Sequence, residues 1–265
     1  MADETPSSSW TAAIPELFYD VLARILPGFV TLASGFYVYG CWRTSIDAWP
    51  IDWEAIAKDT TLWVAFAVTM SSWVLGLLLT PLGESLWARQ RKPQFLNVVA
   101  RHPVQLQQAC DAGILTPALP EGVALDQINA NTENGEKLAG EVYQQLHEYL
   151  KDRKPEWRSV LSKSQAEVTF YANVTAGFMV VLVFGSILST IWLLVARLFA
   201  WKEVAASQIA WFGVLSILPM VVLGECAYWG LYGKVPRLWA RHMGMLSTEL
   251  KSAKDKAVKQ ERTFP

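Results

Sequence analysis

The residue types that could carry out catalysis are scattered through this sequence without a recognisable motif. His147 and Glu148 begin an HExxH zinc-peptidase pattern, but position 151 is a lysine, so the second histidine is missing. The sequence contains no GxxxxGK[ST], GxGxxG or GxSxG pattern of the kind that binds phosphate or presents a nucleophile. We therefore expect no catalytic residue, no bound cofactor and no enzymatic activity.

Cysteines and histidines do not suggest a metal centre either. Three cysteines lie far apart without a CxxC pair, which favours neither a disulfide framework nor zinc. The three histidines, at positions 102, 147 and 242, are single residues. We expect no metal site.

Ionisable and hydroxyl-bearing residues beside or within long apolar runs are the better candidates for function. The ionisable ones are Asp20, Arg24, Glu84 and Glu225. The hydroxyl-bearing ones are Ser186, Ser189 and Thr190. Charge this close to hydrocarbon is costly. The four ionisable groups therefore form ion pairs, snorkel to the interface, or take part in gating. The hydroxyls either pack between helices or line a pore between several copies.

A basic cluster follows the second apolar run, at Arg89, Arg91 and Lys92. Cations just outside a membrane span attract anionic lipid headgroups. We interpret this cluster as a headgroup contact and expect no nucleic-acid binding.

Four runs free of Asp, Glu, Lys and Arg dominate the chain and must position these candidates. They are Ile25 to Trp42, Thr60 to Gly83, Val168 to Ala196 and Val204 to Gly224. A helix needs roughly 20 apolar residues to cross about 30 Å of hydrocarbon. The runs therefore predict four transmembrane helices. We expect the first of them to be retained rather than cleaved as a secretory signal, which predicts an integral membrane protein.

The basic residues of the connections predict the orientation. The segment 84–167 and the tail 234–265 together hold 18 Lys and Arg, whereas the connections 43–59 and 197–203 hold four. Basic residues near spans stay in the cytoplasm. We expect both termini and the middle segment to be cytoplasmic, at the inner membrane if the organism is a bacterium.

The predicted architecture is all-α: a four-helix transmembrane bundle, a small helical cytoplasmic domain between spans 2 and 3, and a helical C-terminal tail. The divisions are 1–83 (N-terminal segment and first hairpin), 84–167 (cytoplasmic domain), 168–233 (second hairpin) and 234–265 (amphipathic tail).

Two helical patterns connect these parts. Residues 155–196 contain no proline after Pro155 and predict one long helix that joins the cytoplasmic domain to the third span. In the tail, apolar residues from Trp239 to Ala257 alternate spacings of four and three. That seam could pack on the cytoplasmic domain, form a coiled coil between copies, or lie on the membrane surface.

The leading hypothesis is a non-enzymatic membrane protein, an oligomeric channel or membrane-perturbing effector controlled by its cytoplasmic helices. The alternative is a membrane anchor or scaffold that tethers a cytoplasmic protein partner. Expected partners are the lipid bilayer, anionic headgroups and further copies of the chain. In layout alone, with no motif, the chain resembles small multi-span effectors of bacterial antiviral systems.

Overall fold

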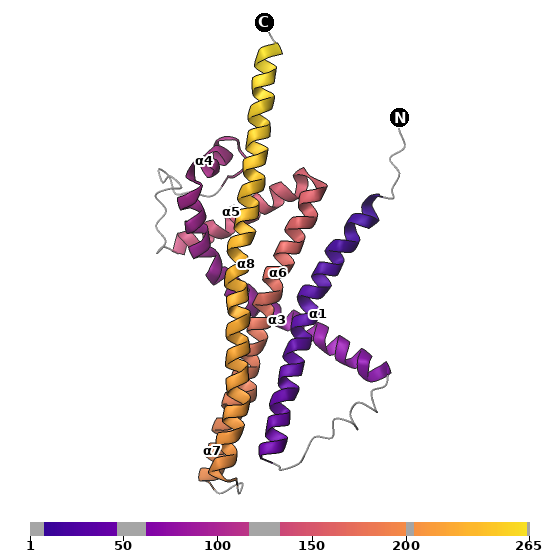
Figure 1. The fold of residues 1–265 in the computed structure, drawn as a ribbon, viewed down its shortest axis with the longest axis vertical. Helices are drawn as coiled ribbons and strands as arrows, with labels where there is room; N and C mark the ends of the chain where they lie inside the picture. The colour runs from indigo at the N-terminus through magenta and orange to yellow at the C-terminus, as the bar shows by residue number, and fades with distance from the viewer. Residues whose placement is uncertain (1–7, 47–61, 117–132, 200–203, 264–265) are drawn as a thin grey trace. The chain divides into compact units, whose positions relative to one another are not determined.

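The regular elements of this protein are all helices within the described part of the chain. The computed structural model describes residues 8–46, 62–116, 133–199 and 204–263. In chain order the helices are α1 (Ser8–Ser45), α3 (Leu62–Arg101), α4 (Pro103–Asp111), α5 (Glu133–Arg153), α6 (Pro155–Val180), the π-helix η2 (Val181–Ile187), α7 (Leu188–Leu198) and α8 (Ala206–Thr263) (Figure 1). The all-α prediction is confirmed.

Four of the helical stretches are long and apolar enough to cross a membrane. They are Val21–Ser45, Val64–Val99, Glu156–Leu198 and Ala206–Asp255. Each overlaps one of the uncharged runs, which supplies its apolar part. The predicted number of helices long and apolar enough to span a membrane is therefore confirmed.

The chain divides into two compact units, and four of the long helical runs contribute to both. One unit comprises residues 20–86 and 169–231 and is called the span unit below. The other comprises residues 1–19, 87–168 and 232–265. It holds 18 of the 23 Lys and Arg residues and is called the charged unit. Four helical runs pass from one unit into the other: α1, α3, the run of α6 to α7, and α8.

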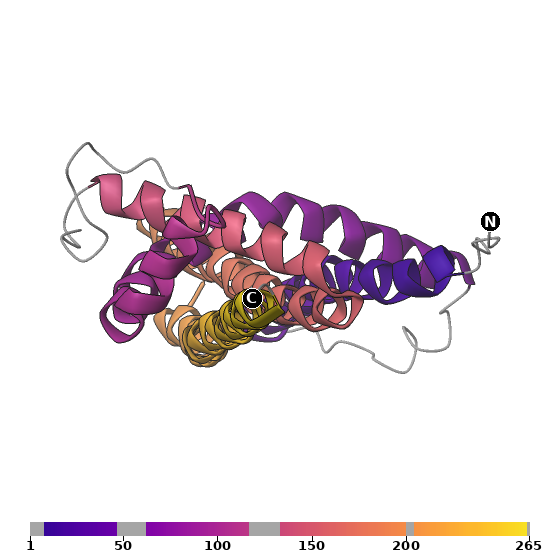
Figure 2. The same ribbon diagram turned by 90° about the horizontal axis from the view of Figure 1, so that it is seen from above.

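Close backbone contact holds the helices of the span unit together. Helix α3 crosses α1 (Figure 2), and a Cβ added to Gly28 would collide with the backbone carbonyl oxygen of Ser72. A Cβ on Gly76 would collide with the carbonyl oxygen of Arg24, and one on Gly177 with the Thr31 hydroxyl. Because lipid supplies no hydrophobic force between helices, such close approach is the main source of their packing energy.

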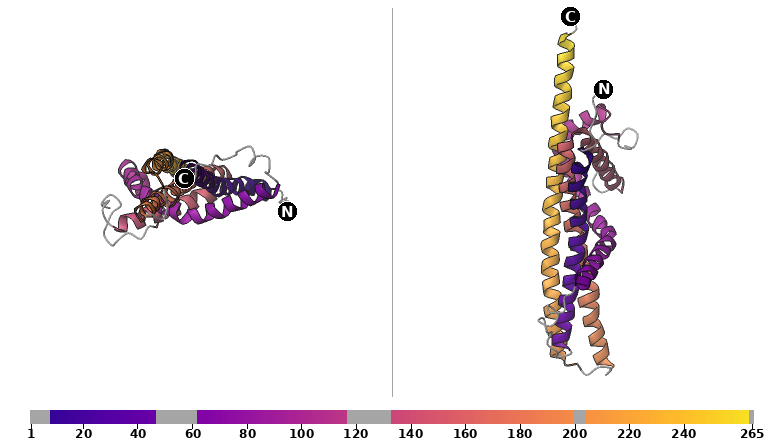
Figure 3. Two further views of the ribbon diagram at one scale, coloured as in Figure 1. Left: turned by 90° about the horizontal axis from the view of Figure 1, so that it is seen from below. Right: turned by 90° about the vertical axis from the view of Figure 1, so that its right-hand side faces the viewer.

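The predicted long helix over residues 155–196 is present with one local difference. Helices α6 and α7 are joined without a gap by η2, whose wider π turns occupy the middle of the third span. A π segment adds a residue to a turn and changes which side chains face each neighbour. Helix α8 is a single rod of 58 residues with α7 beside its beginning (Figure 3).

The charged unit has an apolar core built from α3, α4, α5, α6 and α8. Its fully buried side chains include Phe95, Leu106, Leu146, Leu161 and Leu246. In the tail seam, Trp239 and Met243 are buried as well, whereas Ala253 is exposed. The apolar seam of the tail is therefore buried from Trp239 to Leu246.

Candidate functional site

Two histidines meet in the interior of the charged unit. His147 lies on α5 and His242 lies on α8, 95 positions later in the sequence. Their facing ring nitrogens, Nδ1 of His147 and Nε2 of His242, are 3.1 Å apart. His242 has no exposed surface, whereas His147 is half-buried. This separation is a hydrogen bond between the two rings.

The other nitrogen of His242 determines the tautomers of the neutral pair. His242 Nδ1 lies 2.8 Å from the backbone carbonyl oxygen of Leu238. A carbonyl oxygen only accepts, so Nδ1 carries the proton and Nε2 presents a lone pair. His147 must then donate from its Nδ1. If both rings were charged, two N–H groups would face each other across 3.1 Å. The hydrogen bond between the two rings therefore allows at most one of them to be charged.

Aromatic rings enclose the pair. The Tyr143 ring stacks on His147 with centroids 5.7 Å apart and lies 5.2 Å from the His242 ring. Trp239 is 5.5 Å from Tyr143 and 6.4 Å from His242. Trp87 completes the cluster with an edge contact to Tyr143 at 5.2 Å. These five side chains, from α3, α5 and α8, are called the histidine cluster below.

Burial disfavours charge on the titratable members that lie on α5. Removal from water lowers the pKa of His147, and the positive charge of Lys151 lowers it further, while Glu148 acts in the opposite direction. Burial raises the pKa of the Tyr143 hydroxyl, with Arg91 opposing the shift. Both side chains are therefore neutral at neutral pH.

Two polar atoms of the cluster have no hydrogen-bond partner among the described residues. They are Nε1 of Trp87 and the hydroxyl of Tyr143, and both are buried. An unsatisfied buried group of this kind costs about 1 to 3 kcal/mol. Arg91 lies over the Trp87 ring, 4.4 Å from its centroid, and covers it with a cation.

Polar contacts attach α8 to its neighbours on either side of the cluster. Lys234 pairs with Glu167 of α6 at 2.7 Å, and Arg241 donates a hydrogen bond to the Ser164 hydroxyl on the same helix. Farther along, Glu249 lies 3.6 Å from Arg153 of α5. Helix α8 is therefore held by α5 and α6 through the whole region that contains His242.

The ionisable residues predicted as candidates lie at the edges of the span unit. Arg24 is half-buried, and its backbone carbonyl packs on Gly76. Glu84 and Glu225 are exposed. The side chain of Asp20 lies outside the described residues. The structure places none of these residues in the histidine cluster, which belongs to the other unit.

The predicted hydroxyl residues occupy the middle of the third span. Ser186 is fully buried within η2, and its hydroxyl has no partner among the described residues. Thr190 donates to the Ser186 backbone carbonyl at 2.8 Å. Ser189 is half-buried and lines a cavity that is discussed below. Earlier in the same helical run, Gly177 packs closely against Thr31 of α1.

The two described side chains of the predicted basic cluster differ in exposure. Arg89 is exposed, whereas Arg91 is half-buried against Trp87. The side chain of Lys92 lies outside the described residues. Arg91 thus belongs to the surroundings of the histidine cluster as much as to a headgroup contact.

Sequence reasoning missed both histidines of the cluster because they are far apart in the chain. One signal was present. His147 comes directly after Leu146, which is buried on the same helix as Val142. His242 comes directly before Met243, a buried residue of the tail seam. Two amphipathic helices that each carry a histidine beside their buried face could have been paired on that basis.

The cluster can bind and release a proton, because imidazole is the side chain that titrates near neutral pH. In the described part of the chain, no group of three or more His, Cys, Asp or Glu side chains could hold a metal ion. Comparison with known proteins gives no match to a family model, to a curated protein or to a solved structure.

Proposed function

We propose that this chain is a non-enzymatic membrane protein in which the charged unit controls the spans, as an oligomeric channel or a membrane-perturbing effector. The observation that carries the proposal is the continuity of α8. This one helix of 58 residues, about 87 Å at 1.5 Å per residue, contains both the fourth span and His242. A change in the contacts of α8 in the charged unit therefore acts on the helix that forms the span.

The charge distribution supports a cytoplasmic location for the charged unit and both termini. The charged unit holds 18 of the 23 basic residues, and basic segments resist translocation across the membrane. Anionic lipid headgroups and further copies of this chain are the partners that the proposal includes, together with a cytoplasmic protein partner.

Conduction would require several copies. Many span hydroxyls bond to their own backbone, such as Ser72 to Val68 and Thr31 to Pro27, and both of these residues are buried. A polar path would therefore run between copies, with the half-buried Ser189 and Thr190 as its candidate lining.

Recording from the purified full-length chain in a planar bilayer tests the proposal. Gly233, in α8, has open space around its Cβ position, so Gly233→Ala leaves the helix intact. Gly233→Pro removes a backbone hydrogen bond and kinks the helix. We expect current or vesicle leakage from the unaltered chain and from Gly233→Ala, with altered activity in Gly233→Pro. Absence of current and leakage in every oligomeric state would refute the proposal.

A second candidate function is a membrane anchor or scaffold for a cytoplasmic partner. It is favoured by the apolar surface of the span unit, where exposed side chains such as Phe184, Leu218 and Val222 are those of a helix bundle in lipid. Replacing the four spans by an unrelated tether distinguishes the candidates. Function that survives the replacement supports the scaffold and excludes the channel.

A further inference from the structure

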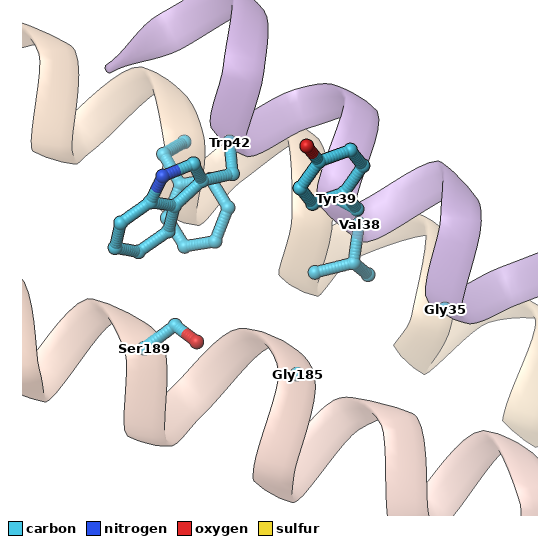
Figure 4. Close-up of a pocket in the computed structure, with 7 residues that line it drawn as sticks. Gly35, Val38, Tyr39, Trp42, Gly185 and Ser189 are labelled. Atoms are coloured by element: carbon cyan, nitrogen blue, oxygen red, sulfur yellow. The ribbon is translucent and has the colours of Figure 1, made fainter. Parts of the chain in front are cut away.

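A cavity of about 340 Å³ opens on the side of the span unit between α1, the joined helices η2 and α7, and α8. One wall is the stripe Gly35, Val38, Tyr39 and Trp42 of α1, and the other is formed by Gly185 and Ser189 (Figure 4). Phe212 of α8 also lines it. The volume falls in the range of about 300 to 1,000 Å³ that is typical of ligand sites in proteins.

Two features of the sequence create this space. The position of a Cβ on Gly35 has no atom within 4 Å, so the missing side chain leaves a notch in α1. Gly185 lies within η2, and the π turns place it and Ser189 opposite α1. Larger side chains at either position would fill the cavity.

The cavity is apolar and elongated along the helices. Its stripe on α1 runs from Gly35 to Trp42, a rise of seven residue steps or about 10 Å at 1.5 Å per residue. Because spans run roughly along the bilayer normal, the cavity has the direction of a lipid chain and about two thirds of the depth of one leaflet, which is about 15 Å.

The surroundings also identify the occupant. Side chains close to the cavity in sequence, including Phe36, Leu188 and Trp192, are exposed and apolar, so the medium at its mouth is lipid hydrocarbon. Arg43 follows Trp42 in the last turn of α1, at the end of the span where a phosphate headgroup lies. The edge-on contact of Trp42 with Phe212, with centroids 5.5 Å apart, gives the cavity a rigid aromatic end.

We propose that this cavity is a binding site for one acyl chain of a membrane phospholipid, held between the glycine notch of α1 and the π-helical segment of the third span. The site does not depend on the function proposed above. It would make the packing of α1 against the third span sensitive to lipid composition.

Photolabelling of the full-length chain tests the site. The protein is reconstituted into phosphatidylcholine vesicles that contain a phosphatidylcholine with a diazirine on its acyl chain, and labelled residues are located by mass spectrometry. We expect labelling at Tyr39, Trp42 and Ser189 about tenfold above that at the lipid-facing Leu218, which corresponds to a preference of about 1.4 kcal/mol.

Two substitutions fill the cavity from opposite walls, Gly35→Leu and Ser189→Phe, and each is expected to reduce this labelling to the level of Leu218. Gly233→Leu is the matched control, since its Cβ position is also open but lies outside the cavity. Labelling spread evenly over the exposed span residues, or labelling that persists in both variants, would overturn the site. Cross-linking of a photoreactive residue at position 39 to a second chain would do the same. If both variants fail to fold, the ratio measured in the unaltered chain decides.

Discussion

Acidification should weaken the charged unit because the histidine cluster cannot accept two charges. In the neutral pair, His242 donates to the Leu238 carbonyl and accepts from His147. At least one of the two rings must stay neutral for this contact to persist. In the unfolded chain both rings are in water, where a histidine pKa is about 6.5. The folded state therefore binds fewer protons than the unfolded state in acid.

The sign and size of the effect follow from this difference. The lowered pKa of His147 means that its contribution to stability is complete above the unfolded pKa and is lost as the pH falls below it. One histidine that stays neutral in the fold costs about 1.4 kcal/mol by pH 5.5, relative to a pH well above 6.5. Typical domains have a free energy of unfolding of about 5 to 15 kcal/mol, so this cost is a substantial fraction of it.

The assay compares free energies of unfolding of the purified chain in detergent at about pH 7.5 and about pH 5.5, followed by tryptophan fluorescence. His242→Leu removes one of the two rings that take up a proton in the unfolded chain, while burial and Lys151 continue to lower the pKa of His147. We expect the acid-induced loss of stability to be about 1.4 kcal/mol smaller in His242→Leu than in the unaltered chain. His102→Leu is the control, because His102 is half-buried at the start of α4 and outside the cluster. Equal pH dependence in the unaltered chain and His242→Leu would refute the tautomer argument.

Three further predictions concern packing and polar contacts. Gly28→Ala should destabilise the span unit by about 1 to 3 kcal/mol, since its Cβ meets backbone, whereas Gly35→Ala should not; thermal unfolding in detergent measures both. A double-mutant cycle with Lys234→Met and Glu167→Gln should give a coupling of about 0.5 to 1 kcal/mol, because both side chains are about one-third exposed, and a coupling near zero would contradict the ion pair. Trp87→Phe keeps an aromatic ring beside Tyr143 and Arg91 and removes an indole N–H that has no partner among the described residues, so stability should be unchanged or higher; a large loss by chemical denaturation would contradict this.

Much of the fold could be predicted because the bilayer constrains sequence strongly. The uncharged runs predicted four spans, and four helices of sufficient length and hydropathy are present. Proline-free sequence from Pro155 predicted the long helix that α6 and α7 form. The π turns at Val181–Ile187 were not predicted, because an uncharged apolar run is equally compatible with α and π turns.

The candidate site could be predicted only in part. Ionisable and hydroxyl residues near the spans are visible as interruptions of an apolar pattern, and Ser189 does line a cavity. The histidine cluster gives no such signal, because its members come from three helices and acquire their properties from mutual contact. Two ordinary solvated histidines become a buried pair only when α5 packs on α8.

The sequence by itself determined that this is a helical membrane protein, because apolar length and the absence of charge are properties of single segments and need no tertiary contact. It also determined where basic charge gathers along the chain. Tertiary structure alone decided which residues meet: the imidazole pair of His147 and His242, the glycine contacts of α1 with α3, and the cavity beside Gly35. Each depends on helix rotation and crossing, which side-chain packing between distant segments sets and local sequence does not encode.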